Sequence, residues 1–363
     1  MSNWPVDHDC CGRRQQRLRD VMEQHGWDVV VVNQPAHVQW LTGVRYPWIF
    51  QVGAALTPDS LTLVAPSRPL DAAATEIVTY EAKWHSTLRN DLRQACDERL
   101  LQTIGPLPAR VAVEGSSAGL HLSLAAPLDA EPELLRLRRF KEPDELRWMK
   151  RAIEATRRMY QTARELIAPG VSELEVFNAL QSAAVLELGE MLTGTGNDYQ
   201  CASRGGPPRS DRQAAAGELY ILDLGPAFRG YFADNARTIA VTDPTPEQLD
   251  ARRLVVEVFS IVEATVRPGA SARQLFETVQ KHLDQAPLGV FNHHLGHGVG
   301  LFPHEAPHLN PNWDDTFEEG DVFTAEPGLY APELSAGMRI ENQYRVTADG
   351  VECLTPFPTD LRV

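Results

Sequence analysis

Five side chains in the last third of the chain are of types that bind metal ions, and each lies beside an apolar run or in a glycine-rich turn. They are Asp223, Asp234, His297, Glu326 and Glu341. Four carboxylates gathered at one point repel one another unless cations neutralise them, and two divalent ions supply the matching charge. Hard oxygens with one imidazole suit Mn²⁺, with Co²⁺ or Zn²⁺ as substitutes. The set therefore predicts a two-metal site.

The spacing of the two aspartates is compatible with a shared site. Ten residues separate Asp223 from Asp234, which fits two antiparallel strands joined by a tight turn near residues 228–230. Side chains directly opposed on such strands have Cβ atoms about 4.5–5.5 Å apart, a span that suits two ions about 3.5–4 Å apart. A solvated hairpin would have the same spacing. The apolar neighbours, such as Ile221 and Ile239, favour a buried pair that needs compensating charge.

The two glutamates lie on β-like runs joined by a turn-rich segment at residues 331–337, so both can point to a common face. Arg339 stands two residues before Glu341 and shares its side of the strand. A guanidinium there could orient a substrate or a ligating carboxylate, or form a plain surface ion pair. Glycines on both sides of His297 allow the backbone to approach a ligand closely.

These residues lie in motifs that occur together in a known family. The motifs are DLG, then D-x-x-R-T from Asp234, GHGVGL followed by HEAP, AEPGLY, and RIEN. In this order they resemble the catalytic domain of the pita-bread metallopeptidases, which include Xaa-Pro dipeptidases (prolidases), Xaa-Pro aminopeptidases and methionine aminopeptidases. The HEAP motif, and an N-terminal part that is similar to the creatinase-type domain, favour the proline-specific branch.

The resemblance implies a fold and a domain division. An α/β creatinase-like domain would occupy residues 1–135. An α+β pita-bread catalytic domain, a pseudo-twofold antiparallel sheet covered by helices, would occupy residues 136–363. The resemblance also implies a homodimer that acts on short peptides.

The same resemblance implies roles for the site residues. Xaa-Pro bonds would be hydrolysed by a hydroxide held between two metal ions, with Asp223 and Glu341 as bridging ligands. Glu326 would bind metal and also move the proton of the attacking water. His304, in HEAP, would polarise the scissile carbonyl, and His293 matches a further active-site histidine of the family.

Two positions depart from this simple picture. His294, next to His293, has no counterpart in the family pattern and is expected to be a turn or rim residue. Typical prolidases also carry a histidine about seventeen residues before the first metal aspartate, where this chain has Gly206. That histidine helps to hold the proline side of the substrate, so its absence should weaken or redirect recognition.

Arg204 and Arg209 flank this gap, and either could bind the free carboxylate of a dipeptide. Both could instead be solvent-facing loop residues.

Three alternatives to a Xaa-Pro peptidase stay open. They are a metallopeptidase that prefers non-proline dipeptides, a metal-free creatinase-like hydrolase, and a binding protein of the same fold.

Composition narrows the class of protein. The net charge of −15, from 34 basic and 49 acidic residues, disfavours nucleic acid as a partner. The N-terminal segment lacks the apolar core of a signal peptide, and no apolar stretch approaches the ~18 residues of a membrane span. Five cysteines at irregular spacing do not form a disulfide framework. We therefore expect a cytoplasmic enzyme that does not bind membranes.

The elements that must position the site can also be anticipated. An amphipathic helix is predicted at residues 13–26, followed by a buried parallel strand at 28–32. Later in the chain, two segments 99 residues apart share the pattern P-G-x-S, at Ser172 and Ser271. Each serine has Glu or Gln three residues on, the capping pattern that begins a helix. Two related halves of one catalytic domain would explain this repeat.

Overall fold

The computed structural model describes residues 4–106, 108–117, 126–196 and 198–362, which form two compact units. The first unit is Met1–Arg138 and the second is Arg139–Val363. Among the described residues, no helix is long and apolar enough to cross a membrane.

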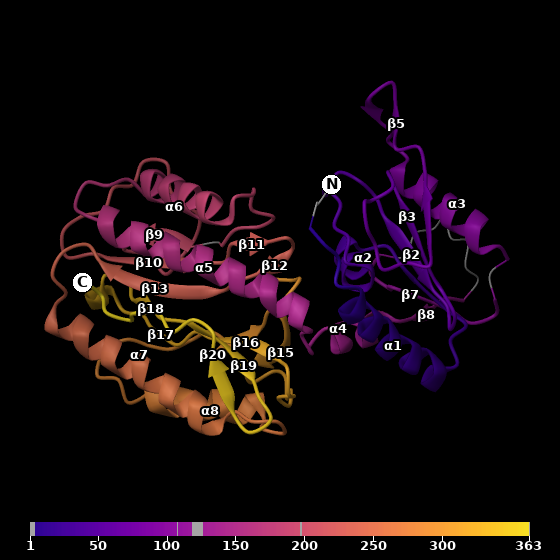
Figure 1. Ribbon diagram of the computed structural model, residues 1–363. Coiled ribbons are helices and arrows are strands. Elements are labelled where there is room, and N and C mark those ends of the chain that lie inside the picture. The colour runs from indigo at the N-terminus through magenta and orange to yellow at the C-terminus, as the bar shows by residue number, and fades with distance from the viewer. Residues whose placement is uncertain (1–3, 107, 118–125, 197, 363) are drawn as a thin grey trace. The chain divides into compact units, whose positions relative to one another are not determined.

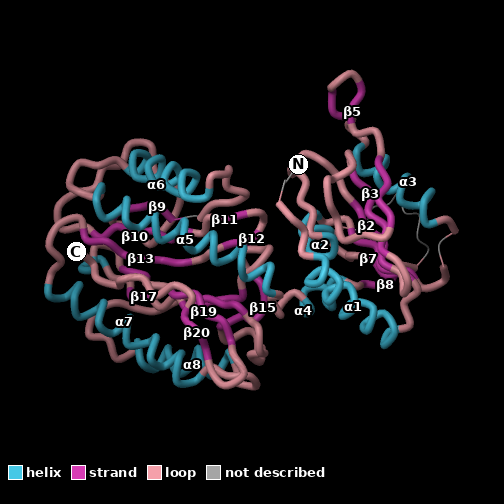
Figure 2. Tube along the Cα trace, in the orientation of Figure 1, coloured by secondary structure: helices cyan, strands magenta, loops and turns pink. Residues whose placement is uncertain are grey.

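The first unit is built around a six-stranded mixed sheet in the order β4-β3-β2-β1-β7-β8 (Figures 1 and 2). Its strands are β1 Val29–Val32, β2 Gly53–Leu56, β3 Leu61–Ala65, β4 Glu76–Thr79, β7 Val111–Val113 and β8 Leu128–Asp129, with a small hairpin of β5 Lys83–Trp84 and β6 Thr87–Leu88. Its helices are α1 His8–His25, α2 Pro35–Thr42, α3 Leu92–Ile104 and α4 Glu131–Leu137.

Strand β1 lies inside this sheet, and its four valines are buried. It runs parallel to β7, as predicted, but antiparallel to β2. Helix α1 begins five residues earlier than predicted, at His8, because the side chain of Asp7 accepts the backbone N–H of Cys10 and caps the helix.

The second unit places its strands between two pairs of helices (Figure 1). The helices are α5 Pro143–Leu166, α6 Glu173–Leu188, α7 Pro246–Thr265 and α8 Ala272–Leu283. One sheet has the order β13-β10-β9 and contains β9 Asp198–Cys201, β10 Leu219–Leu224 and β13 Asn235–Ala240. The other has the order β15-β14-β16-β19-β20 and contains β14 Gly296–Gly298, β15 Glu305–Leu309, β16 Val322–Ala325, β19 Asn342–Val346 and β20 Val351–Cys353. Two short ribbons are β11 Ala227–Phe228 with β12 Tyr231–Phe232, and β17 Gly328–Leu329 with β18 Met338–Arg339.

The two halves of this unit have separate apolar cores. Helices α5 and α6 pack against the three-stranded sheet through residues such as Met159, Leu180 and Leu222. Helices α7 and α8 pack against the five-stranded sheet through residues such as Val258 and Phe323. This arrangement agrees with the repeat seen in the sequence.

The predicted helix starts are present in both halves. Helix α6 has Ser172 as its N-cap, and Glu175 completes a capping box. Helix α8 has Ser271 as its N-cap, and this side chain accepts the backbone N–H of Gln274. Capping depends on neighbouring residues alone, which is why these two starts could be anticipated.

The aspartate hairpin differs from the prediction in its register. Strands β10 and β13 do pair antiparallel, but Asp223 stands opposite Ala236, and Asp234 lies one residue before β13 begins. The ribbon of β11 and β12 is inserted between the two strands, with its turn at Arg229 and Gly230. The two aspartates are therefore not directly opposed. They are offset by two positions on the same face of the hairpin.

The glutamates, in contrast, lie level with one another. Strands β16 and β19 pair so that Ala325 stands opposite Asn342. The next step of this ladder brings Glu326 level with Glu341. Both glutamates come at the ends of buried strands that meet at the same edge of the sheet.

Candidate metal centre and active site

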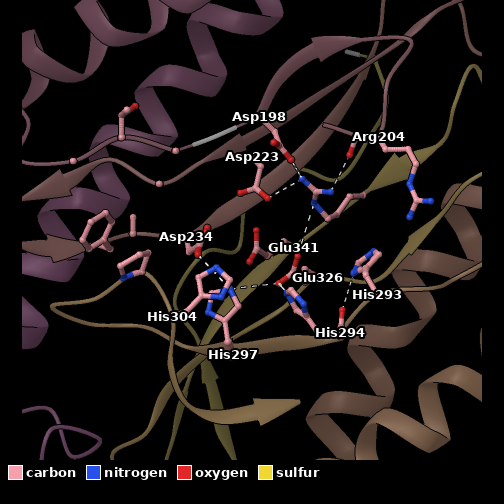
Figure 3. Close-up of a pocket in the computed structure, with 18 of the residues that line it drawn as sticks. Asp198, Arg204, Asp223, Asp234, His293, His294, His297, His304, Glu326 and Glu341 are labelled. Atoms are coloured by element: carbon pink, nitrogen blue, oxygen red, sulfur yellow. Dashed lines mark hydrogen bonds and ion pairs between the residues drawn. The ribbon is translucent and has the colours of Figure 1, made fainter. Parts of the chain in front are cut away.

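All of the predicted site residues except Arg209 meet at one cavity of about 510 Å³ (Figure 3). Its lining includes the four predicted carboxylate ligands, four histidines with the predicted ligand His297 among them, and two arginines. These residues are Asp223, Asp234, Glu326, Glu341, His293, His294, His297, His304, Arg204 and Arg339, together with Asp198. Arg209 is not part of this lining.

His297 lies at the centre of two overlapping groups of possible metal ligands. One group is His294, His297 and Glu326, and the other is Asp234, His297 and Glu341; within each group the ligand atoms lie within 4.8 Å of one another. His297 Nε2 is 3.5 Å from Glu326 Oε1 and 3.7 Å from Asp234 Oδ2. Its Nδ1 is 3.0 Å from the carbonyl oxygen of Gly298, a contact that leaves Nε2 as the ligand atom.

Two carboxylates at this point, Asp234 and Glu341, form no ion pair with an arginine or lysine among the described residues. Glu341 is 1% exposed, and no hydrogen-bond partner among the described residues reaches its Oε2. Burial raises the pKa of Asp234 and of Glu341 well above the ordinary values, and the neighbouring carboxylates raise both further. Burial likewise raises the pKa of Asp223 to about 6. Buried charge of this kind needs a counter-charge, so the residues present fit divalent cations.

Arg339 is buried, so it does not form the surface ion pair that the sequence left open. Its Nη2 contacts Asp198 and lies 2.9 Å from Asp223 Oδ2. Asp198 stands opposite Asp223 in the pairing of β9 with β10. Sequence reasoning missed Asp198 because no motif marks it; only the register of these two strands brings it to the site.

The two aspartates differ in their relation to the two groups of possible metal ligands. Asp223 belongs to neither ligand group and instead holds Arg339. Asp234 shares a group with His297 and Glu341. Asp234 thus lies closer than Asp223 to His297 and Glu341, and the bridging role that the resemblance implied for Asp223 stays a prediction.

The four histidines take different positions around Glu326. His304 stacks on His297, with ring centroids 3.7 Å apart and planes 12° apart. Both nitrogens of His293 are engaged, Nδ1 at 2.7 Å from the carbonyl oxygen of His294 and Nε2 at 3.0 Å from Tyr330 Oη. His294 Nε2 lies nearer to Glu326 than His297 Nε2 does, at 2.8 Å from Oε1.

His294 lies in the irregular segment before β14 and its side chain is 37% exposed, which is compatible with the expected turn or rim position, but the sequence did not indicate its contact with Glu326. The consecutive histidines of HHLGH did not reveal which ring turns inward, because that depends on the strands that flank them. Burial opposes ionisation of Glu326, but the hydrogen bond to His294, together with the charges of His294, His297 and Arg339, outweighs burial and lowers the pKa of Glu326 to about 2.

The two arginines flanking Gly206 have different surroundings. Arg204 is exposed at the cavity, where its guanidinium lies 4.2 Å from the centroid of the Tyr330 ring and donates to Asn292. Arg209 donates from Nε and Nη2 to Glu173, which is fully buried, and to the carbonyl oxygen of Cys201. The structure thus directs Arg209 away from the cavity, contrary to the predicted substrate contact.

Each of the two units matches the model of a known protein family. Residues 147–348 match the model of metallopeptidase family M24, and residues 14–139 match the creatinase/prolidase N-terminal domain. The Xaa-Pro dipeptidase of Lactobacillus delbrueckii subsp. lactis is 27% identical, over 96% of this chain and 98% of the relative.

Two solved structures cover nearly all of the chain. The prolidase of Pyrococcus horikoshii OT3 has a TM-score of 0.80 and 23% identity, over 96% of this chain and 99% of its own. Dipeptidase PepE of Mycobacterium ulcerans has a TM-score of 0.78 and 26% identity, over 99% of both chains. The match to the family model spans more than half of the chain and includes the metal-ligand cluster. The chain therefore belongs to metallopeptidase family M24, with a creatinase-type N-terminal domain ahead of a pita-bread catalytic domain.

Proposed function

We propose that the chain is a two-metal peptidase that hydrolyses Xaa-Pro bonds in dipeptides or short peptides. The observation that carries this proposal is the pair of ligand groups that share His297, set among buried carboxylates whose charge the protein alone does not balance. Asp223, Asp234, His297, Glu326 and Glu341 would hold the two ions. Mn²⁺, Co²⁺ and Zn²⁺ all suit this set of donors.

Bound ions would supply the Lewis acidity that activates a water molecule near neutral pH. Glu326 lines the cavity, with its Oε1 2.8 Å from His294 Nε2 and 3.5 Å from His297 Nε2, where its carboxylate could accept a proton from the attacking water. From its place among the ligands it would move that proton to the leaving nitrogen. His304 stacks on His297 at the cavity, where a ring N–H could donate to the carbonyl oxygen as negative charge develops there.

Arg204 would hold the free carboxylate of a dipeptide. Its guanidinium is exposed at the cavity, and stacking on Tyr330 restricts its orientation. A planar guanidinium can bind a carboxylate through two parallel hydrogen bonds. Arg339 cannot do the same without giving up its contacts to Asp198 and Asp223, so its proposed role is to hold the site in place and to orient the substrate.

A second candidate, a preference for non-proline dipeptides, is favoured by the loop at Gly206. This glycine has a φ of +129°, and a Cβ added there would lie 2.8 Å from Gln200 Nε2. Its N–H donates to Asp198 Oδ1 at 2.6 Å. The loop is therefore shaped for a residue without a side chain, and the histidine that usually helps to hold the proline side has no equivalent in it.

The first experiment tests the metal requirement. The protein is stripped of metal with a chelator, metal loss is verified by elemental analysis, and hydrolysis is measured before and after Mn²⁺, Co²⁺ or Zn²⁺ is restored. We expect activity to be abolished and then recovered. Full turnover by protein verified to be metal-free would contradict the proposal and favour a metal-free hydrolase.

The second experiment decides between the two substrate classes. Xaa-Pro dipeptides, longer Xaa-Pro peptides and non-proline dipeptides are compared by kcat/KM with the same metal. Selective cleavage of Xaa-Pro bonds supports the main proposal, whereas a preference for non-proline dipeptides supports the second candidate. In either case, restriction to dipeptides together with a raised KM in Arg204→Ala would assign the carboxylate contact to Arg204.

A further inference from the structure

His294 is placed as a metal ligand would be, although nothing in the family pattern assigns it. Its Nε2 lies 2.8 Å from Glu326 Oε1, and the ligand atoms of His294, His297 and Glu326 all lie within 4.8 Å of one another. The ring centroids of His294 and His297 are 5.6 Å apart. Figure 3 shows the His294 ring turned towards Glu326.

The spacing of the donor atoms matches the shell of a single ion. Bonds of about 2.1 Å put neighbouring ligand atoms about 3.0 Å apart at right angles and about 3.4 Å apart at the tetrahedral angle. The two nitrogens lie 2.8 and 3.5 Å from Glu326 Oε1, close to these two values. One ion beside Oε1 could therefore contact both imidazoles after small movements.

The backbone fixes this arrangement. The N–H of Glu326 donates to the carbonyl oxygen of Leu295 at 2.7 Å, and the N–H of Leu295 donates to the carbonyl oxygen of Leu309 at 2.8 Å. These bonds hold the residue that follows His294 against Glu326. The neighbouring His293 lies in the same segment, but contacts to Tyr330 and to the backbone engage both of its nitrogens.

We propose that His294 is a second imidazole ligand of the ion held by His297 and Glu326, which makes that position selective for Zn²⁺ or Co²⁺ over Mn²⁺. The inference rests on the metal site of the proposed function and adds a ligand to it. Imidazole nitrogen binds Zn²⁺ and Co²⁺ more strongly than Mn²⁺, so a position with two nitrogens favours the first two ions. The arrangement with a single imidazole would favour Mn²⁺ more.

The first test measures metal affinity without using activity. Chelator-stripped wild-type protein is titrated with Zn²⁺ and with Mn²⁺ by calorimetry, beside His294→Asn and His294→Gln. Loss of even an indirect contact to a ligand costs about 10–100-fold in metal affinity. We expect zinc affinity to fall by at least about 10-fold in both variants, and manganese affinity to fall clearly less.

The matched control is His293→Asn, which removes a neighbouring imidazole from the same segment. It should leave the ratio of zinc to manganese affinity at the wild-type value. Thermal unfolding verifies that each variant is folded before titration. Equal losses for the two metals in the His294 variants, or an unchanged ratio, would overturn the proposal.

A crystal structure of the zinc-loaded wild-type protein separates a ligand from a hydrogen-bond partner. The proposal expects His294 Nε2 at about 2.0–2.1 Å from an ion that also contacts His297. If the ion is bound by His297 and Glu326 while His294 stays hydrogen-bonded to Glu326, the proposal is overturned and the two-metal peptidase stands. If no ion binds at the cluster, the proposed function fails as well.

Discussion

Buried carboxylates occur in two contrasting settings in the catalytic domain. Glu173, at the start of α6, is fully buried but accepts the backbone N–H groups of Cys201 and Arg209 and the guanidinium of Arg209. Burial opposes its ionisation, yet these contacts outweigh burial and lower its pKa. Asp234 and Glu341 are set among other carboxylates, and their pKa values are raised well above the ordinary range.

The difference shows which charges the chain balances by itself. Around Glu173 the protein supplies every donor needed, as expected of a structural residue. Around Glu341 it supplies more acids, and one carboxylate oxygen is left without a hydrogen bond among the described residues. A cluster that would be unfavourable in the folded chain alone is the mark of a site completed by a bound cation.

The largest effect, a loss of kcat, is expected from a substitution at Glu326, in the carboxylate cluster of the proposed metal site. Glu326→Gln keeps the size of the side chain and removes its ability to accept a proton, so kcat should fall by about 10²–10⁴-fold. The loss of stability should be small. Steady-state kinetics with restored metal measures the change, and calorimetry checks that metal still binds. Turnover close to wild type in a variant that binds metal normally would remove Glu326 from the role of proton carrier.

Lys141 and Glu305 provide a balanced pair close to the site. Their ion pair is 3.0 Å long, with side chains 1% and 4% exposed, and Glu305 follows His304 directly. Lys141→Met removes the buried ammonium that faces Glu305 and should lower the free energy of unfolding by about 3–5 kcal/mol, measured by urea denaturation.

The double variant Lys141→Met/Glu305→Leu is the control for this prediction. It removes both charges, so it should recover part of the stability that Lys141→Met loses. Added metal should stabilise wild type and Lys141→Met to the same extent, because the pair lies outside the ligand groups. A single variant as stable as wild type would show that this pair is not needed to balance the buried charge.

The parts of this site that depend on local sequence were predictable, and those that depend on pairing over a distance were not. The serine caps of α6 and α8 and the residues of the ligand motifs follow from a few adjacent positions. The offset of Asp223 from Asp234 depends on the inserted β11–β12 ribbon, which the ten-residue spacing did not reveal. Asp198 and His294 reach the site through strand register and side-chain rotation, and neither is encoded by a motif.

The raised pKa of Asp223, about 6, predicts how pH acts on the metal-free protein. An ordinary aspartate has a pKa near 3.9, so the folded state holds this proton more tightly than the unfolded state does. The resulting stability is present below about pH 4 and is lost as pH rises through about 6.

The free energy of unfolding of metal-free wild type should therefore fall over this range by up to about 3 kcal/mol relative to Asp223→Asn, which lacks the titrating group. Urea denaturation of both chelator-treated proteins at pH 4.5 and 7 measures this difference, and parallel pH dependences would contradict the prediction.

The smallest effect is expected at Arg209, and it tests the balanced setting most directly. Arg209→Ala removes the guanidinium from Glu173, but Glu173 keeps the backbone N–H groups of Cys201 and of residue 209 itself, at 3.0 and 2.7 Å. Because these donors remain and the arginine is partly exposed, the free energy of unfolding should fall by only about 1 kcal/mol.

KM for dipeptides should stay at the wild-type value in Arg209→Ala, since Arg209 is directed away from the cavity. Arg204→Ala is the matched control, in which the proposed carboxylate contact predicts a raised KM with little change in stability. If Arg209→Ala raised KM as much as Arg204→Ala did, the loop would have to rearrange when substrate binds, and Glu173 would belong to the substrate site rather than to the balanced interior.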